Sequence, residues 1–152
     1  MTKLKKSVWF DGSNQIDCDI QKVKKSLAEI GKHFVGVVSL MPGISNVVLD
    51  KEGKDFVIIK NNEGLMKRTN IVKSVQTDKF VIEFDEEYQA GKKMNGKSHY
   101  FCEFSSKGKV VNFHLIISNV QFPGFLGFLY RNFGSRSIGN ATLRSYKTYF
   151  EK

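Results

Sequence analysis

The middle of the chain, from Ile44 to Phe122, contains six stretches with strand character that are divided by turn signals. The dividing sequences are KEGK, NNEG, QTD, GKKMNG and KGK, and they are rich in the Gly, Asn and Asp residues that tight turns require. Strands that follow one another through short turns pair as antiparallel neighbours. The sequence therefore predicts one antiparallel meander of six strands.

A further strand and two helices are expected before the meander. Apolar residues of one parity run from Val8 to Cys18 across a break at Gly12, which suits a long strand with a bulge. From Asp19, a candidate N-cap, the apolar residues recur at helical spacing. A second short helix is expected over residues 32–38.

The last part of the chain begins with an aromatic run, QFPGFLGFLYRNFG. Its pattern predicts a long helix from Pro123 to Phe150, because proline suits a first helical turn and few helix breakers follow. Only Arg131 is charged before Gly134, whereas a helix lying on a membrane needs basic residues along its polar side. A helix that is apolar nearly all round is enclosed on several sides, as a core helix, a dimer seam or the wall of a pocket would be.

The order of elements, from SVWFDGSNQIDCDIQKVKKSL to ATLRSYKTYFEK, is strand, two helices, six strands and a long helix, an α+β protein. It resembles the helix-grip fold of the SRPBCC superfamily, also described as Bet v 1-like, START-related or polyketide cyclase/dehydrase-like. The resemblance covers residues 1–152 as a single domain and has no short diagnostic motif. It implies a seven-stranded antiparallel sheet curled around the C-terminal helix, with a cavity for lipids, sterols, polyketides or other apolar molecules.

Strand parity indicates which side chains face that helix, because alternate residues of a strand point to the same side. An ordinary solid core is the alternative to a cavity, and the resemblance favours a partly hollow one. Together with the aromatic run, this parity gives the candidate ligand-binding residues Phe84, Glu86, Tyr88, Tyr100, Phe104, Phe113, Phe125, Leu126, Leu129, Tyr130 and Phe133.

Glu86 is the most suggestive polar candidate. A carboxylate facing Phe84 and Phe104 is costly unless it is paired, hydrated or neutral, although it could also lie at the wet end of its strand. Arg68 is a more distant candidate, and its simpler interpretation is an exposed strand arginine. A bulge between Phe84 and Tyr88 would reverse the prediction for Glu86.

The sequence contains no nucleophile elbow, phosphate-binding glycine loop or HExxH helix. The histidines, His33, His99 and His114, are isolated in sequence and are interpreted as exposed or edge residues. Cys18 and Cys102 are far apart and are interpreted as small buried residues. We therefore expect no metal and no cofactor.

The leading hypothesis is the binding or transport of a small hydrophobic molecule such as a lipid, polyketide or aromatic metabolite. The main alternative is a cyclase- or dehydratase-like enzyme that uses Glu86 and tyrosines as acid and base. A third class is an interaction module for a partner protein, RNA or the ribosome, as some members of the superfamily associate with ribosomes.

Charge argues against nucleic acid as the main partner. The net charge is +9, but the lysines are scattered and VIEFDEE places a negative stripe in the middle of the chain. DNA is not an expected partner, and RNA or the ribosome is a less favoured one. No signal peptide and no membrane-spanning stretch is recognised, so a cytoplasmic location without integral membrane contact is expected. The sequence predicts neither the oligomeric state nor the identity of the ligand.

Overall fold

The structure is a computed structural model of the chain and describes residues 7–91, 94–122 and 134–152. The order of elements is the predicted strand, two helices, six strands and helix. The elements are β1 (Val8–Ile16), α1 (Ile20–Ala28), α2 (Ile30–Val38), β2 (Val48–Glu52), β3 (Val57–Lys60), β4 (Gly64–Val75), β5 (Lys79–Ala90), β6 (Met94–Lys107), β7 (Val110–Gln121) and α4 (Ser135–Glu151).

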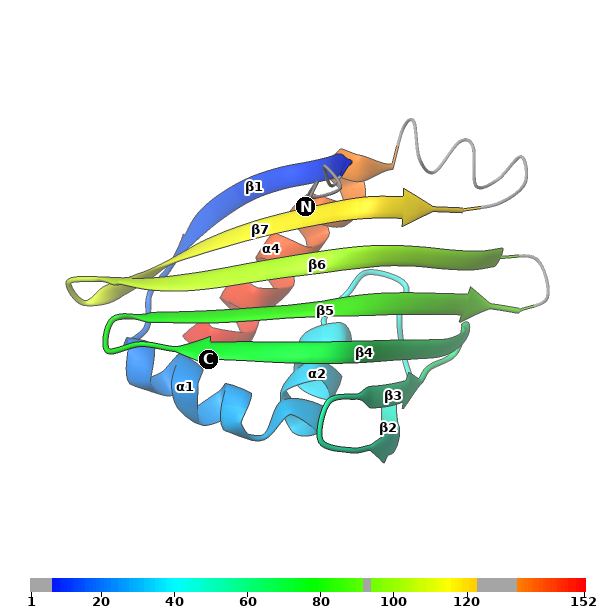
Figure 1. The fold of residues 1–152 in the computed structure, drawn as a ribbon, viewed down its shortest axis with the longest axis horizontal. Helices are drawn as coiled ribbons and strands as arrows, with labels where there is room; N and C mark the ends of the chain where they lie inside the picture. Colours follow the sequence, from blue (N-terminus) through cyan, green and yellow to red (C-terminus); the bar gives the residue numbers. More distant parts are fainter. Residues whose placement is uncertain (1–6, 92–93, 123–133) are drawn as a thin grey trace, which may run out of the picture.

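The strands form a single antiparallel sheet in the order β1-β7-β6-β5-β4-β3-β2. Figure 1 shows α4 running behind the sheet, with α1 and α2 on the same side. The helix α4 contacts β1 and β7, while α2 contacts β2 and β3. One face of the sheet is thus covered by helices, which confirms the predicted helix-grip arrangement.

The first helix begins where the sequence indicates. The Asp19 carboxylate accepts a hydrogen bond from the backbone N–H of Gln21 at 2.7 Å, which satisfies one of the N–H groups that a helix start leaves unpaired. Val23 and Leu27, which share one face of α1, are fully buried. The cap fixes the start of α1, and the apolar face packs α1 against β5 and β6.

The alternation of the long strands confirms the predicted inward face. Phe84 on β5, Cys102 on β6 and Leu115 on β7 are all buried. Farther along β6 and β7, the rings of Phe104 and Phe113 stack with centroids 4.7 Å apart. Tyr146 of α4 packs on Phe113 at 4.6 Å, so this end of the interior is a closed aromatic core.

The strand β4 changes direction in its middle. Its pairing with β5 is irregular between Thr69 and Val72, and Asn70 has a φ of 52°, a left-handed conformation that Asn tolerates better than most residues. Before the irregularity Arg68 is buried, as Met66 is, whereas Val72 beyond it is 65% exposed although it shares their parity. The interpretation of Arg68 as an exposed strand residue is therefore wrong.

The C-terminal helix is confirmed, but its expected start is corrected. In the described part of the chain it begins at Ser135, with Gly134 as the N-cap residue, so it does not run unbroken from Pro123. Glycine is a poor residue for a helix interior, which accounts for a boundary at this position. The expected helical segment from Pro123 to residue 133 lies outside the described residues.

Candidate ligand-binding cavity

A cavity of about 240 Å³ lies between the sheet and the helices. Its described lining is largely apolar and comes from both the sheet and the helices. The helix α2 and the loop after it contribute Val38 and Met41, β7 contributes Ile117, and α4 contributes Ala141 and Tyr146. These elements are distant in sequence, so the cavity exists only in the folded sheet-and-helix arrangement.

The buried ion pair of Arg68 and Glu86 lines this cavity. The two residues are direct partners in the β4–β5 register. Both Nε and Nη2 of Arg68 lie 3.0 Å from Oε2 of Glu86, and the two side chains are only 7% and 9% exposed. The sequence left open whether Glu86 is paired, hydrated or neutral, and the structure shows it paired.

Aromatic rings hold the guanidinium from the other sides. Its central carbon lies 4.4 Å from the ring centroid of Phe34, 4.7 Å from that of Phe84 and 5.7 Å from that of Tyr100, distances at which ring faces attract cations. Burial is the largest single effect and alone would lower the pKa of Arg68, but the charge and hydrogen bond of Glu86, together with smaller effects of Tyr146 and Tyr100, raise the pKa above its usual value. Arg68 is therefore a fixed cation.

One donor of Arg68 remains available. Its Nη1 is buried, and no described residue provides a hydrogen-bond acceptor for it. Buried polar groups in proteins nearly always have a partner. An unpaired guanidinium nitrogen beside a cavity is therefore the least satisfied polar group of this site.

The rim of the cavity carries a second pair of polar side chains. The hydroxyl of Tyr88 donates a hydrogen bond to Oε1 of Glu63 at 2.7 Å, and both residues line the cavity. Burial, followed by the hydrogen bond to the Glu63 carboxylate, raises the pKa of Tyr88 above its usual value. Tyr88 is only half-buried, which places it at the opening rather than in the depth.

The candidate residues fall into three groups. Phe84, Glu86, Tyr88 and Tyr100 all line the one cavity, and the rings of Phe84 and Tyr100 stack at 5.1 Å. Phe104 and Phe113 lie instead in the closed aromatic core and are not among the described lining residues. The remaining candidates lie outside the described residues and are Phe125, Leu126, Leu129, Tyr130 and Phe133.

Part of the cavity wall consists of residues that the sequence does not indicate. Met41, Ile138 and Ala141 line the cavity but were not candidates. Ile138 and Ala141 are three residues apart on α4, so they share a face, yet the sequence does not reveal how that helix is rotated against the sheet. The loop that carries Met41 has no strand or helix period from which to infer its direction.

The expectation that His33 is exposed or at an edge is also wrong. The residue is fully buried on α2, with Nδ1 2.9 Å from the Ser26 hydroxyl. Burial, with smaller effects from the Arg68 and Lys73 charges, lowers the pKa of His33 to about 3. The ring is thus neutral and packs edge-on against Tyr149 at 5.4 Å.

The other two histidines lie on the opposite face of the sheet, as expected. The two ring nitrogens of His99 lie 2.8 Å from carboxylate oxygens of Glu83 and Asp85. His114 Nε2 lies 2.6 Å from a carboxylate oxygen of Asp11. Within residues 7–91, 94–122 and 134–152, no three His, Cys, Asp or Glu side chains come together as a metal site.

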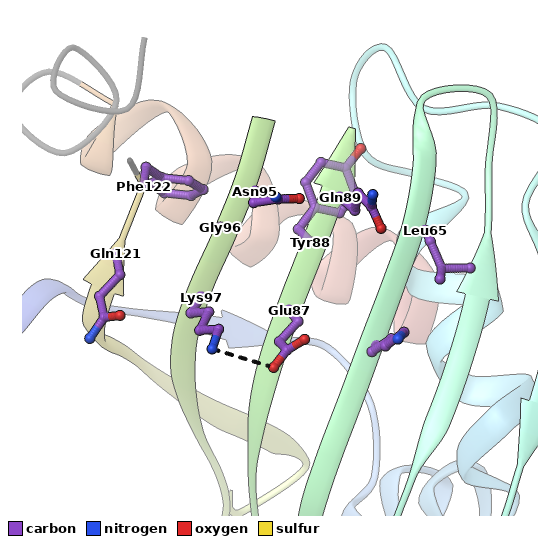
Figure 2. Close-up of a pocket in the computed structure, with 10 residues that line it drawn as sticks. Leu65, Glu87, Tyr88, Gln89, Asn95, Gly96, Lys97, Gln121 and Phe122 are labelled. Carbon is purple, nitrogen blue, oxygen red and sulfur yellow. Dashed lines mark ion pairs between the residues drawn. The ribbon is translucent and has the colours of Figure 1, made fainter. Parts of the chain in front are cut away.

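Figure 2 shows a second, wider pocket of about 570 Å³ at the end of the sheet where β5 and β7 terminate. Its lining includes the ion pair of Lys97 Nζ and Glu87 Oε1, 3.8 Å apart, whose side chains are mostly exposed. Tyr88 and Phe122 line both pockets, so the two pockets are neighbours. The inner cavity is the stronger candidate site because it combines apolar walls with a buried, fixed charge pair.

The architecture defines the chain as a helix-grip protein, which confirms the expected resemblance to the SRPBCC superfamily at the level of the fold. No protein-family model matches the sequence, and no curated protein matches it either. None of the helices in the part of the chain that the structure describes is long and apolar enough to span a membrane.

Three solved structures are similar to this one. A STAR-related lipid transfer protein from Xanthomonas axonopodis has a TM-score of 0.60 and 12% identity, over 93% of this chain and 85% of that chain. A conserved protein from Geobacillus kaustophilus has a TM-score of 0.60 and 10% identity, over 92% and 88%. A hypothetical protein from Helicobacter pylori has a TM-score of 0.60 and 11% identity, over 99% of each chain. At such identities the likeness shows the fold alone.

Proposed function

We propose that this protein binds a small hydrophobic molecule in the cavity between the sheet and α4. The observation that carries the proposal is the apolar cavity itself, which lies beside a closed aromatic core built from the same strands. Voids larger than a water molecule are few in protein interiors, which pack as densely as organic crystals. The structural likeness to a protein named for lipid transfer supports the same class of ligand.

The volume of the cavity limits the ligand. At about 240 Å³ it lies below the range of about 300–1,000 Å³ that is usual for drug-sized ligands. It equals the space of about eight liquid waters at about 30 Å³ each. We therefore infer a compact ligand with on the order of ten non-hydrogen atoms.

Binding is favoured over catalysis because the ionisable side chains that the cavity offers as acid or base already have partners. Oε2 of Glu86 accepts a hydrogen bond from Nε of Arg68 and forms an ion pair with its Nη2, and the Tyr88 hydroxyl donates to Glu63. Tyr146 is hydrogen-bonded to the buried thiol of Cys102. An acid–base reaction would require one of these contacts to be released for proton transfer.

A thermal unfolding experiment with tetralin, an uncharged hydrocarbon of suitable size, tests the proposal. A ligand that binds only the folded state at ten times its Kd adds about 1.4 kcal/mol of stability, which raises Tm by about 3–6 °C for a chain of this length. Native mass spectrometry should show one bound molecule. The same two measurements are made with α-tetralone, the corresponding ketone.

Matched variants locate the site. Ala141→Phe places a ring in the cavity and should abolish the shift in Tm, whereas Ala28→Phe, the same change at an exposed position of α1, should retain it. Ala141→Met provides a smaller obstruction if the phenylalanine impairs folding. Failure of the wild-type protein to bind either tetralin or α-tetralone would refute the proposed function.

A further inference from the structure

We propose that the ligand is an uncharged molecule whose carbonyl or hydroxyl oxygen accepts a hydrogen bond from Nη1 of Arg68. This inference rests on the proposed function and gives the chemical class of its ligand. The site is the buried, polar part of the cavity wall formed by Arg68 and Glu86 with the rings of Phe84 and Tyr100, and the ring of Phe34 supports the guanidinium.

The unpaired Nη1 donor of Arg68 supports a ligand with an oxygen acceptor. Arg68 is 6% exposed, lines the cavity, and has no acceptor for Nη1 among the described residues. A buried donor without a partner loses the free energy of its hydration. An acceptor on the ligand would restore that hydrogen bond, which a pure hydrocarbon cannot do.

The guanidinium of Arg68 is held in one position by its neighbours. Oε2 of Glu86 holds Nε and Nη2 at 3.0 Å each, and the ring centroids of Phe34 and Phe84 lie 4.4 and 4.7 Å from the central carbon. Nη1 is therefore the part of the group that is left for a ligand. Its donor is positioned before the ligand arrives, so little ordering opposes the new hydrogen bond.

The charged side chains that line the cavity favour a neutral ligand. The described lining contains one cation, Arg68, and two carboxylates, Glu63 and Glu86. An anionic ligand would meet a guanidinium that Glu86 already neutralises, with Glu63 at the rim adding repulsion. A cationic ligand would have no acceptor to offer Nη1. A neutral oxygen acceptor fits both the free donor and the charge of the lining.

Three ligands that share one carbon skeleton test the inference on the wild-type protein: tetralin, α-tetralone and tetralin carboxylate. Affinities measured by calorimetry should show α-tetralone binding about tenfold tighter than tetralin, as expected for one hydrogen bond to a charged donor. Tetralin carboxylate should bind more weakly than the ketone. The ketone and the hydrocarbon differ by a single oxygen, so the comparison isolates the acceptor.

Two variants assign the preference to Arg68. Arg68→Met combined with Glu86→Leu removes both charges together, which avoids an unpaired buried carboxylate, and the affinity ratio of ketone to hydrocarbon should fall to about one. Glu86→Gln removes only the neutralising charge, and tetralin carboxylate should then become the tightest ligand of the three. Both variants are checked for a cooperative thermal transition before binding is measured.

The outcomes separate this inference from the proposed function. Equal affinities of the wild-type protein for tetralin and α-tetralone would overturn the inference and leave hydrophobic binding intact. Tightest binding of the carboxylate to the wild-type protein would also overturn it. Binding of none of the three molecules would overturn the proposed function together with the inference.

Discussion

Arg68 and Glu86 face each other across β4 and β5, and a single carboxylate oxygen, Oε2 of Glu86, accepts a hydrogen bond from Nε of Arg68 at 3.0 Å and forms an ion pair with Nη2 at the same distance. The pair lies in a largely apolar cavity rather than on the surface. Taking two charges out of water is costly, and their attraction compensates only while both are present. The behaviour of this pair is therefore the most direct energetic test of the site.

Arg68→Met should destabilise the protein by about 3–5 kcal/mol, because it leaves Glu86 buried without its cation. The double variant Arg68→Met/Glu86→Leu should recover most of that loss. Urea unfolding measures both free energies. Lys97→Met, which breaks the exposed ion pair with Glu87, serves as the control and should have little effect. A single Arg68→Met variant as stable as the wild type would mean that the pair is not desolvated.

The neutral, buried His33 predicts a loss of stability in acid. The pKa of His33 is lowered from 6.5 to about 3, so between these values the unfolded chain binds a proton that the folded protein does not. The contribution is complete above about pH 6.5 and is lost as the pH falls. From pH 7 to pH 5 it should remove about 2 kcal/mol.

His33→Leu isolates this contribution because it removes the titrating ring. The free energy of unfolding of wild type and variant is measured by urea at both pH values, and the variant should lose about 2 kcal/mol less than the wild type on acidification. Other titrating groups are common to the two proteins and cancel in the comparison. Equal losses would show that His33 is protonated in the folded state.

At Gly139 the backbone of α4 lies against the Phe10 ring of β1. A Cβ atom at this position would collide with the ring of Phe10. Gly139→Ala should therefore destabilise the protein by about 1–3 kcal/mol of overpacking, less up to about 1 kcal/mol of improved helix propensity. Asn140→Ala, at the neighbouring exposed position, should be neutral or stabilising. A stabilised Gly139→Ala variant would contradict the close approach of α4 and β1.

Asn70 sets the direction of the second half of β4. Its left-handed backbone, with φ 52°, costs most residues about 1–2 kcal/mol, and its Nδ2 also donates to Oδ2 of Asp85 at 2.9 Å. Asn70→Val should thus be destabilising by at least that amount, while Asn70→Gly should lose only the hydrogen bond. Thermal unfolding compares the two variants. Equal stability would argue against a left-handed backbone conformation at Asn70.

Where local pattern and fold agree, the sequence was sufficient. The uninterrupted alternation of β5 predicts the inward direction of Phe84 and Glu86, and the Asp19 cap predicts the start of α1. On β4 the parity holds from Met66 to Arg68, which are both buried, and fails at Val72, because the irregularity at Asn70 interrupts it. A left-handed asparagine within a strand has no clear signature in a single sequence.

Tertiary contacts account for the other differences. His33 lies on a short helix that is apolar on most of its surface, so its burial depends on how α2 packs against α4. Ala141 enters the cavity wall through the rotation of α4 against the sheet. Neither relationship follows from the periodicity of its own helix. Both become apparent only when the helices and the sheet are placed together.

The central claim is that the cavity takes up a small apolar molecule. Intermolecular NOEs between α-tetralone and assigned methyl groups test this claim most directly. Ile117, which lines the cavity, and Val111, buried in the closed part of the same strand, form a matched pair on β7. If the ligand binds in the cavity, we expect NOEs from α-tetralone to the methyl groups of Ile117 and Ala141 and none to those of Val111. NOEs confined to surface methyl groups, or none at saturating ligand, would contradict it.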